Sequence, residues 1–284
     1  MADEAWTHHE GVVNGVRLHW VEAGKGPLVV LLHGFPEFWY AWRNQIPALA
    51  EAGFRVVALD LRGYNLSEKP REVSAYGMAT VAEDVAELIR HLGAERAHVA
   101  GHDWGGVVAW WLAMLHPERV ERLVIFNAPH PRVFRRELKT LRQLRKSWYA
   151  FFFQLPRLPE AVFRRGGFAI LDRVFLESPR RKGAYTARDV EKYREAVSRP
   201  GAITAMLNYY RAARRVPNPR TRRIDAPTLV IWGEKDPHLN VENTVGLEPH
   251  VPSVRVERIP DASHWVLADA PDRVNELMIA FLRE

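Results

Sequence analysis

The sequence of 284 residues contains no cysteine. Disulfide bonds, thiolate nucleophiles and cysteine zinc sites are therefore excluded, and the composition fits a cytoplasmic protein. No hydrophobic run approaches the roughly 18 residues that a membrane-spanning helix needs, and Met1–Ala5 lacks the basic and then apolar pattern of a signal peptide. The sequence also shows no fixed-period repeat and no low-complexity segment. We expect a cytoplasmic globular protein with no stable membrane anchor.

Acidic residues are scarce in one part of the chain. Between Arg132 and Arg220, 22 Lys and Arg stand against 7 Asp and Glu, although the net charge of the whole chain is only +6. Basic segments can bind nucleic acid. Here the arginines are scattered among apolar residues at helical positions, such as Leu138 and Leu141, which favours a solvated helical face. We expect no nucleic-acid partner and interpret the change in charge as a domain boundary.

Short apolar runs without alternation are typical of parallel strands buried on both faces. Runs of this kind are Leu28–Leu32, Arg55–Leu59, Ala97–Ala100, Leu123–Phe126, Thr228–Trp232 and Val254–Ile259. Helical patterns separate them, most clearly in Met78–Leu92, and Asn14-Gly15 signals a tight hairpin. The alternation predicts an α/β fold with a mostly parallel central sheet.

The alternation of strands and helices breaks after Pro131 and resumes after about Pro219. The intervening sequence is helical, arginine-rich and aromatic. We therefore predict a core in two parts, residues 1–131 and 221–284, and a helical cap, residues 132–220, inserted between two strands. Such a cap would lie over the carboxyl ends of the strands, where ligands bind in open α/β sheets.

One hexapeptide, Gly101-His102-Asp103-Trp104-Gly105-Gly106, follows a predicted strand. Small residues in this layout are typical of a sharp turn from a strand into a helix, where Cβ atoms would clash. Most hydrolases with this turn carry serine or cysteine at the apex, whereas this chain carries Asp103. A carboxylate nucleophile forms an alkyl ester, so its target should be an electrophilic sp³ carbon. An incidental aspartate at a helix N-terminus is the simpler alternative.

Two further polar residues follow predicted strands. Asp236 comes after Thr228–Trp232, and His264 comes after Val254–Ile259. Nucleophile, acid and histidine is the chain order of hydrolases with this turn. Each residue alone is more often structural, but the order and the shared sheet edge favour a catalytic triad of Asp103, Asp236 and His264.

The segment His33-Gly34-Phe35-Pro36-Glu37 directly follows the first predicted parallel strand. In such a loop the Phe35 N–H can lie beside the Trp104 N–H, and the pair would form an oxyanion hole. Pro36 would set a rigid bend, with a cis peptide as one form of it. An ordinary Gly-Pro turn is the alternative. We expect His33, Pro36 and Trp104 to contact the substrate.

These motifs resemble those of the α/β-hydrolase fold epoxide hydrolases, over essentially the whole chain. The matching segments are His33–Glu37, Asp60-Leu61-Arg62-Gly63-Tyr64, Gly101–Gly106, Asn127-Ala128-Pro129-His130-Pro131, Asp236 and Ser263-His264-Trp265. Haloalkane and fluoroacetate dehalogenases share much of the two glycine-containing loops. Asn65 stands where relatives often have glycine, and asparagine tolerates the left-handed conformation well.

The resemblance implies two cap tyrosines as proton donors to the epoxide oxygen. The first lies ahead of a Gln-x-Pro segment and matches Tyr149, and the second matches Tyr210 in Asn208-Tyr209-Tyr210-Arg211. Successive helical residues diverge by about 100°, so Tyr209 and Tyr210 cannot both face one cavity. An alkoxide leaving group needs such O–H donors, whereas a departing halide usually needs a pair of N–H donors. Trp104 could supply one of that pair, and the sequence offers only Trp39, with weak support, as the second. The two tyrosines therefore favour an epoxide over a halide.

The resemblance therefore implies an epoxide hydrolase that converts a small hydrophobic epoxide and water to a vicinal diol, with no metal and no cofactor. Phe153 and Trp265 would also contact the substrate. The arginine-flanked run Tyr149–Phe153 would suit a membrane surface as well, but pocket lining is the simpler interpretation without an anchor. The alternatives are a dehalogenase and a non-catalytic ligand-binding protein of the same fold. We expect a monomer or a homodimer.

Overall fold

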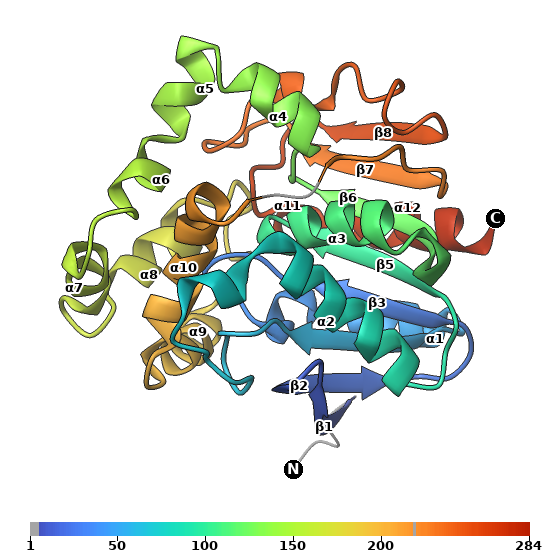
Figure 1. The fold of residues 1–284 in the computed structure, drawn as a ribbon, viewed down its shortest axis with the longest axis horizontal. Coiled ribbons are helices and arrows are strands. Elements are labelled where there is room, and N and C mark those ends of the chain that lie inside the picture. The colour runs from blue at the N-terminus through green and yellow to red at the C-terminus, as the bar shows by residue number, and fades with distance from the viewer. Residues whose placement is uncertain (1–5, 218–219) are drawn as a thin grey trace.

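An eight-stranded sheet forms the centre of the molecule (Figure 1). The computed structural model describes residues 6–217 and 220–284, so the predictions that fall on Met1–Ala5 and on Pro219 lie outside the described residues. The strand order is β1-β2-β4-β3-β5-β6-β7-β8. The strands are β1 (Thr7–Val13), β2 (Val16–Ala23), β3 (Leu28–Leu32), β4 (Arg55–Asp60), β5 (Ala97–His102), β6 (Val120–Phe126), β7 (Thr228–Gly233) and β8 (Val254–Ile259).

Most of this sheet is parallel. β2 pairs antiparallel with β1 and with β4, and all other neighbouring strands run parallel. The α/β fold with a mostly parallel sheet is thus confirmed. The turn between β1 and β2 falls at Asn14-Gly15, where both residues have positive φ. Asn65 also has a positive φ, of 39°, which is the conformation that asparagine tolerates.

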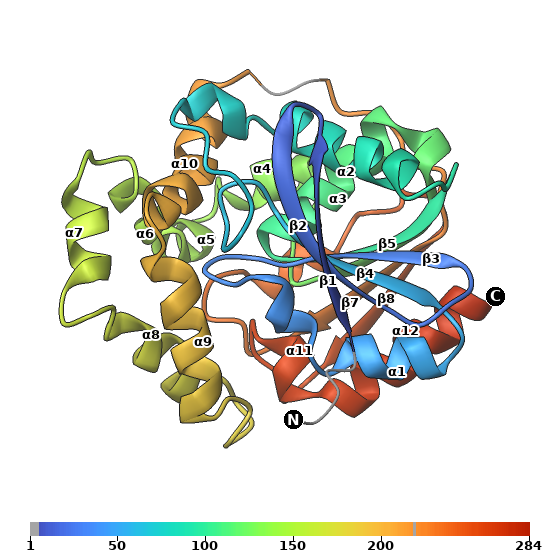
Figure 2. The same cartoon turned by 90° about the horizontal axis from the view of Figure 1, so that it is seen from below.

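Helices cover both faces of the sheet, which explains why its central strands are mostly apolar. Figure 2 shows α2 (Met78–His91) and α3 (Trp104–Leu115) on one face, and α1 (Gln45–Glu51), α11 (Val266–Asp269) and α12 (Pro271–Arg283) on the other. Every residue of β3 and β5 is buried. Single 3₁₀ turns complete this part of the fold: η1 (Trp39–Trp42), η2 (Val73–Tyr76), η3 (Pro117–Arg119) and η5 (Val241–Thr244).

Between β6 and β7 the described residues form helices and no strand. These inserted helices are α4 (Pro131–Glu137), α5 (Leu141–Lys146), α6 (Trp148–Phe152), α7 (Leu158–Arg164), α8 (Ile170–Asp172), the π-helix η4 (Arg173–Glu177), α9 (Ala187–Ser198) and α10 (Ala202–Arg215). In Figure 1 they lie beside the sheet, on the side toward which the arrowheads of β7 and β8 point. The predicted boundaries of core and cap stay a prediction.

Helix α10 is joined to the rest of the fold through Tyr209. The Tyr209 hydroxyl donates a hydrogen bond of 2.9 Å to the backbone carbonyl of Arg62, and its ring packs against Tyr64 and Tyr76. The Arg62 guanidinium lies buried in a bidentate ion pair with Asp84 of α2. These buried contacts fix the orientation of α10, and therefore the direction in which the Tyr210 side chain points.

We expect Asp84→Ala to lower the free energy of unfolding by about 3–5 kcal/mol, because removing one partner leaves a buried guanidinium uncompensated. Glu87→Ala on the same helix is the control. Glu87 pairs with Arg90 at the surface, so its loss should change stability by less than about 1 kcal/mol. Urea unfolding followed by circular dichroism measures both values, and equal values would contradict a stabilising role for the buried pair.

Candidate active site

Asp103 occupies the turn at which β5 passes directly into α3. Its backbone has φ 50° and ψ −119°, a conformation that costs a non-glycine residue about 1–3 kcal/mol and is concentrated at functional sites. The turn is tight, since a Cβ atom on Gly105 would lie 2.2 Å from the Leu32 carbonyl oxygen. The backbone geometry explains why small residues surround Asp103 in the sequence.

Asp236 and His264 reach Asp103 from the loops that follow β7 and β8. His264 Nδ1 lies 2.7 Å from Asp236 Oδ2, and His264 Nε2 lies 3.5 Å from Asp103 Oδ2. The structure therefore brings together the three residues that the chain order singled out. They form a line of carboxylate, imidazole and carboxylate at the carboxyl edge of the sheet.

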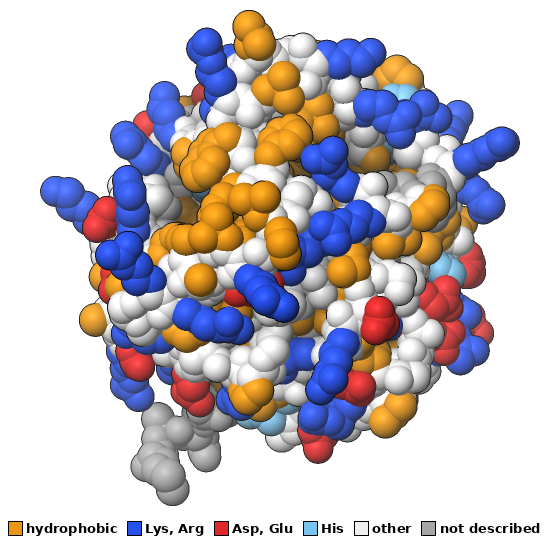
Figure 3. Space-filling view, turned by 60° about the vertical axis from the view of Figure 1, so that its left-hand side comes forward, with side chains coloured by type: hydrophobic (Ala, Val, Ile, Leu, Met, Phe, Trp, Pro, Cys, Tyr) orange, Lys and Arg blue, Asp and Glu red, His pale blue; other side chains and the backbone are white. Residues whose placement is uncertain are grey.

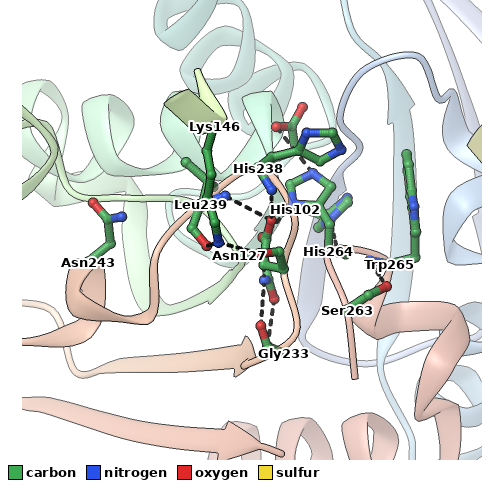
Figure 4. Close-up of polar contacts among 12 residues, drawn as sticks. His102, Asn127, Lys146, Gly233, His238, Leu239, Asn243, Ser263, His264 and Trp265 are labelled. Carbon is green, nitrogen blue, oxygen red and sulfur yellow. Dashed lines mark hydrogen bonds and ion pairs between the residues drawn. The ribbon is translucent and has the colours of Figure 1, made fainter. Parts of the chain in front are cut away.

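Three further donors hold the Asp236 carboxylate in place. The backbone N–H groups of His238 and Leu239 donate to Oδ1 at 2.7 and 2.9 Å, and Asn127 Nδ2 donates to Oδ2 at 2.7 Å. Figure 4 shows Asn127 below His264, with its side chain also directed at Gly233. Burial opposes ionisation of Asp236, but the attraction of His264 and these hydrogen bonds hold its pKa well below the usual range. Asp236 is therefore an anion.

The surroundings of His264 favour its charged form. Burial lowers the pKa of His264, but the carboxylates of Asp236 and Asp103 outweigh burial and raise the pKa well above its ordinary value. Burial likewise disfavours the Asp103 anion, and the hydrogen bond and charge of His264 lower its pKa all the same. The site thus favours an imidazolium between two carboxylates.

The loop after β3 supplies a backbone donor to the same carboxylate. The Phe35 N–H donates to Asp103 Oδ1 at 2.8 Å. This approach requires glycine at position 34, because a Cβ on Gly34 would lie 2.4 Å from the Asp103 Cβ. The Phe35–Pro36 peptide is cis. Trp104 is the first residue of α3, so its N–H has no acceptor within the helix and is available to a neighbouring oxyanion.

A cavity of about 510 Å³ lies between the inserted helices and the loops after β3, β5, β7 and β8. Most of the residues expected in the site line it: Phe35, Pro36, Asp103, Tyr149, Phe153, Tyr210, His264 and Trp265. The other lining residues, which sequence reasoning did not identify, are Arg145, Lys146, Trp148, Phe163, Ile170, Val174, Pro237 and His238. The lining is largely aromatic and aliphatic, as suits a hydrophobic ligand.

Two tyrosines face this cavity from the inserted helices. The rings of Tyr149 on α6 and Tyr210 on α10 lie 6.0 Å apart, and Tyr209 points away toward Arg62. Burial raises the pKa of both Tyr149 and Tyr210 well above the ordinary value, and the nearby negative charge of Asp103 acts in the same direction. Both hydroxyl groups therefore keep their protons and can donate hydrogen bonds into the cavity.

Two residues expected to contact the substrate do not line the cavity. The His33 ring is fully buried, with Nδ1 2.9 Å from the Gly34 carbonyl oxygen and Nε2 3.1 Å from the Leu61 amide nitrogen. It therefore supports the loop from beneath. The indole ring of Trp104 packs against Tyr209 and Tyr210, at ring distances of 5.7 and 4.9 Å. The Trp104 ring therefore packs against Tyr210 and does not itself line the cavity.

Sequence reasoning did not identify three polar residues that surround the triad. His102 lies 2.8 Å from both Glu37 and the carbonyl oxygen of His264, so it links two of the loops. Lys146 donates to the Asp236 carbonyl oxygen at 2.6 Å. The His238 ring lies 5.2 Å from the His264 ring (Figure 4), and burial followed by repulsion from His264 lowers its pKa to about 4. His102 and His238 each lie within two residues of a predicted triad member, which is the one signal that the sequence carries for them.

Comparisons with known proteins match this geometry. Residues 27–271 match the family described as the alpha/beta hydrolase fold. The chain is 44% identical to the AB hydrolase superfamily protein YfhM of Bacillus subtilis, over 95% of this chain and 96% of that protein. It is 39% identical to epoxide hydrolase 4 of Mus musculus, over 95% of this chain and 77% of the relative.

A solved structure leads to the same family. The crystal structure of the Bacillus megaterium epoxide hydrolase in complex with an inhibitor superposes with a TM-score of 0.91 and 37% identity. The superposition covers 97% of this chain and all of the other. Since these relatives match in sequence over nearly the whole chain as well as in fold, the protein belongs to the alpha/beta hydrolase fold family and, within it, to the epoxide hydrolases.

Proposed function

We propose that this protein hydrolyses a small hydrophobic epoxide to a vicinal diol, in two steps through a hydroxyalkyl ester on Asp103. The observation that carries the proposal is that the hydroxyl groups of Tyr149 and Tyr210 share one cavity with the carboxylate of Asp103. A carboxylate attacks an sp³ carbon, and an epoxide oxygen leaves as an alkoxide that needs O–H donors. The cavity supplies both requirements.

In the first step the Asp103 carboxylate attacks the less hindered carbon of the epoxide. Oδ1 accepts the hydrogen bond from Phe35, so Oδ2 is the attacking atom. A new Oδ2–carbon bond forms as the carbon–oxygen bond of the ring breaks. Tyr149 and Tyr210 donate to the ring oxygen and supply the proton that it takes. The product is an ester with a neighbouring hydroxyl group.

Formation of the ester prepares His264 for the second step. The ester carries no charge, so one of the two carboxylates that raise the pKa of His264 is lost. His264 then loses a proton, and the tyrosine that gave its proton to the epoxide oxygen takes one up, so both tyrosines are protonated again. The neutral imidazole, oriented by Asp236 (Nδ1 to Oδ2, 2.7 Å), acts as a general base toward water.

Water activated by His264 attacks the Asp103 carboxyl carbon. The N–H groups of Phe35 and Trp104 stabilise the oxyanion that forms. When the bond between that carbon and the ester oxygen breaks, the leaving alkoxide takes the proton of the new hydroxyl group on Asp103. The diol leaves, Asp103 is again a carboxylate, and His264 keeps the proton that it took from water. The proton balance closes without a metal or cofactor.

The inserted helices act in this mechanism as the cap that the sequence predicts at residues 132–220. They contribute Tyr149 and Tyr210, whereas residues 1–131 and 221–284 contribute the triad and the oxyanion donors. A cytoplasmic location and a monomeric or homodimeric state belong to the same proposal, and the composition without cysteine supports the location.

Replacing any member of the triad should abolish diol formation from styrene oxide. We expect Asp103→Asn, Asp236→Asn and His264→Gln each to reduce kcat/KM by at least about a thousand-fold, because the members act as a unit. In His264→Gln the first step remains, so the peptide containing Asp103 should gain the mass of the epoxide. Full turnover by Asp103→Ala would overturn the mechanism.

Release of halide from haloalkanes or haloacetates, without diol formation, would assign the site to a dehalogenase.

The tyrosines are tested by removing single hydroxyl groups. Tyr149→Phe and Tyr210→Phe should each lower the rate of ester formation by about 10²–10⁴-fold, since general acids contribute this much. Tyr209→Phe is the matched control, because the Tyr209 hydroxyl bonds to Arg62 outside the cavity. Single-turnover kinetics measures ester formation directly. Equal losses in Tyr209→Phe and Tyr210→Phe would show a structural effect of the helix instead.

The two steps should separate with pH. Acid protonates His264 in the ester form and stops ester hydrolysis. Below the pKa of His264 in that form, kcat should therefore fall about tenfold per pH unit. Ester formation should persist at the same pH, because His264 keeps the pKa of Asp103 below the ordinary value. Rapid quenching followed by mass spectrometry should therefore find the ester accumulating as pH falls. Slow turnover at acid pH without accumulated ester would contradict the proposed role of His264.

A further inference from the structure

Large exposed hydrophobic side chains gather on the outer surface of the inserted helices. Seven of them between positions 141 and 176 expose 40–72% of their surface, and Val12 and Val245 alone match them elsewhere in residues 6–217 and 220–284. Figure 3 looks at this side and shows hydrophobic side chains collected over it, with Lys and Arg around them. We call these seven residues the apolar face: Leu141, Trp148, Phe151, Leu155, Leu158, Val162 and Leu176.

Apart from Trp148, which also lines the cavity, the residues of the apolar face are distinct from the cavity lining, although both sets come from the same helices. On α6, Trp148 and Phe151 are three residues apart and are both exposed, whereas Tyr149 lines the cavity. On α7, Leu158 and Val162 are four residues apart and exposed, and Phe163 is buried against the cavity. Helical spacing thus directs one set inward and another outward. The outward set has no catalytic task.

The cavity opens at this face. Trp148 is 64% exposed and also lines the cavity. Arg145, likewise exposed, lines the cavity beside it. A ligand that enters past these two side chains therefore crosses the apolar face first.

Charge around the apolar face is strongly positive. Residues 132–182 include 14 Lys and Arg but only four acidic residues. Each acidic residue is already paired, in the ion pairs Arg136–Glu137, Glu160–Arg211, Asp172–Arg194 and Arg173–Glu177. Exposed guanidinium groups at Arg157, Arg164 and Arg165 therefore remain to attract anions. The Arg214 guanidinium lies 5.6 Å from the ring of the exposed Phe151, so cations adjoin the apolar side chains directly.

We propose that the apolar face docks on an anionic lipid bilayer. Aromatic and aliphatic side chains would enter the interface, and the arginines around them would contact lipid phosphates, a pairing typical of proteins that lie on membranes. No helix among the described residues has the length and apolarity to cross a bilayer, so the contact is peripheral. A second copy of the chain fits this face less well, because two such faces would bring guanidinium groups against one another.

Docking in this orientation turns the mouth of the cavity toward the bilayer. Hydrophobic epoxides partition into lipid. If the proposed function holds, the substrate then passes from the bilayer past Trp148 to Asp103. This consequence rests on the proposed function, whereas docking itself does not.

Flotation with vesicles, in the absence of any epoxide, tests the docking. At low ionic strength the chain of 284 residues should float with vesicles of equal parts phosphatidylcholine and phosphatidylglycerol, and should not float with vesicles of phosphatidylcholine alone. Salt should weaken the binding, since it screens the charges. Failure to float with the mixed vesicles at low salt would overturn the proposal while leaving diol formation, measured separately, untouched.

Paired variants assign the binding to this surface. Phe151→Ser with Leu158→Ser removes apolar area, and Arg164→Gln with Arg165→Gln removes charge. Each pair should weaken vesicle binding about tenfold or more. Val12→Ser with Val245→Ser is the control, since both are exposed elsewhere, and its binding should be unchanged. All three pairs lie outside the cavity and should keep activity on a water-soluble epoxide.

Sedimentation tests the alternative occupant of the apolar face, a second copy of the chain. Analytical ultracentrifugation should give the same mass for the parent and for Phe151→Ser with Leu158→Ser. A dimer that dissociates in this variant would show that a second copy covers the apolar face, and would overturn the lipid proposal. Unchanged vesicle binding in both test pairs would overturn it as well.

Discussion

The position of Asp103 depends on how closely three backbone segments approach one another. β5 turns into α3 against the carbonyl group of Leu32, with room for no Cβ atom on Gly105. The loop after β3 then comes so near that position 34 must also be glycine. Close packing of this kind forces Asp103 into a rare backbone conformation and aims its carboxylate into the cavity. Every other part of the site is arranged around that fixed point.

Charge couples the carboxylate to its neighbours. An imidazolium lies between Asp103 and Asp236, so the ionisation of each group depends on the others. Neutralising Asp103 by alkylation therefore changes the proton affinity of His264 without any movement of the chain. In the proposed mechanism this coupling orders the two steps, because the base becomes available only when an ester is present. Hydrogen bonds to Asp236 from two backbone N–H groups and Asn127 keep the third member of the line anionic throughout.

Much of the fold follows from the sequence because its signals are local. The six apolar runs lie within the six parallel strands, and Asn14-Gly15 lies at the hairpin. The meeting of Asp103, Asp236 and His264 follows from one rule, that parallel strands end at the same edge. For Tyr149 and Tyr210, family resemblance was needed, since a tyrosine in a helix is more often a core residue.

Contacts that depend on side-chain packing were beyond sequence reasoning. His33 sits in the loop that forms the site, yet both of its ring nitrogens face the backbone. His238 lines the cavity, and its only signal in the sequence is its position two residues after Asp236. The two orientations are set by how loops pack in three dimensions, which no spacing rule encodes.

Insertion of the helices between β6 and β7 divides the chemistry between two parts of the chain. In the proposed mechanism the ring-opening step needs tyrosines from the insertion, whereas ester hydrolysis needs only groups attached to the sheet. A change within the insertion can therefore alter which electrophile is accepted and leave the hydrolytic step intact. The two half-reactions are separately adjustable, and new substrates can be acquired by mutation of the insertion without rebuilding the machinery that regenerates the enzyme.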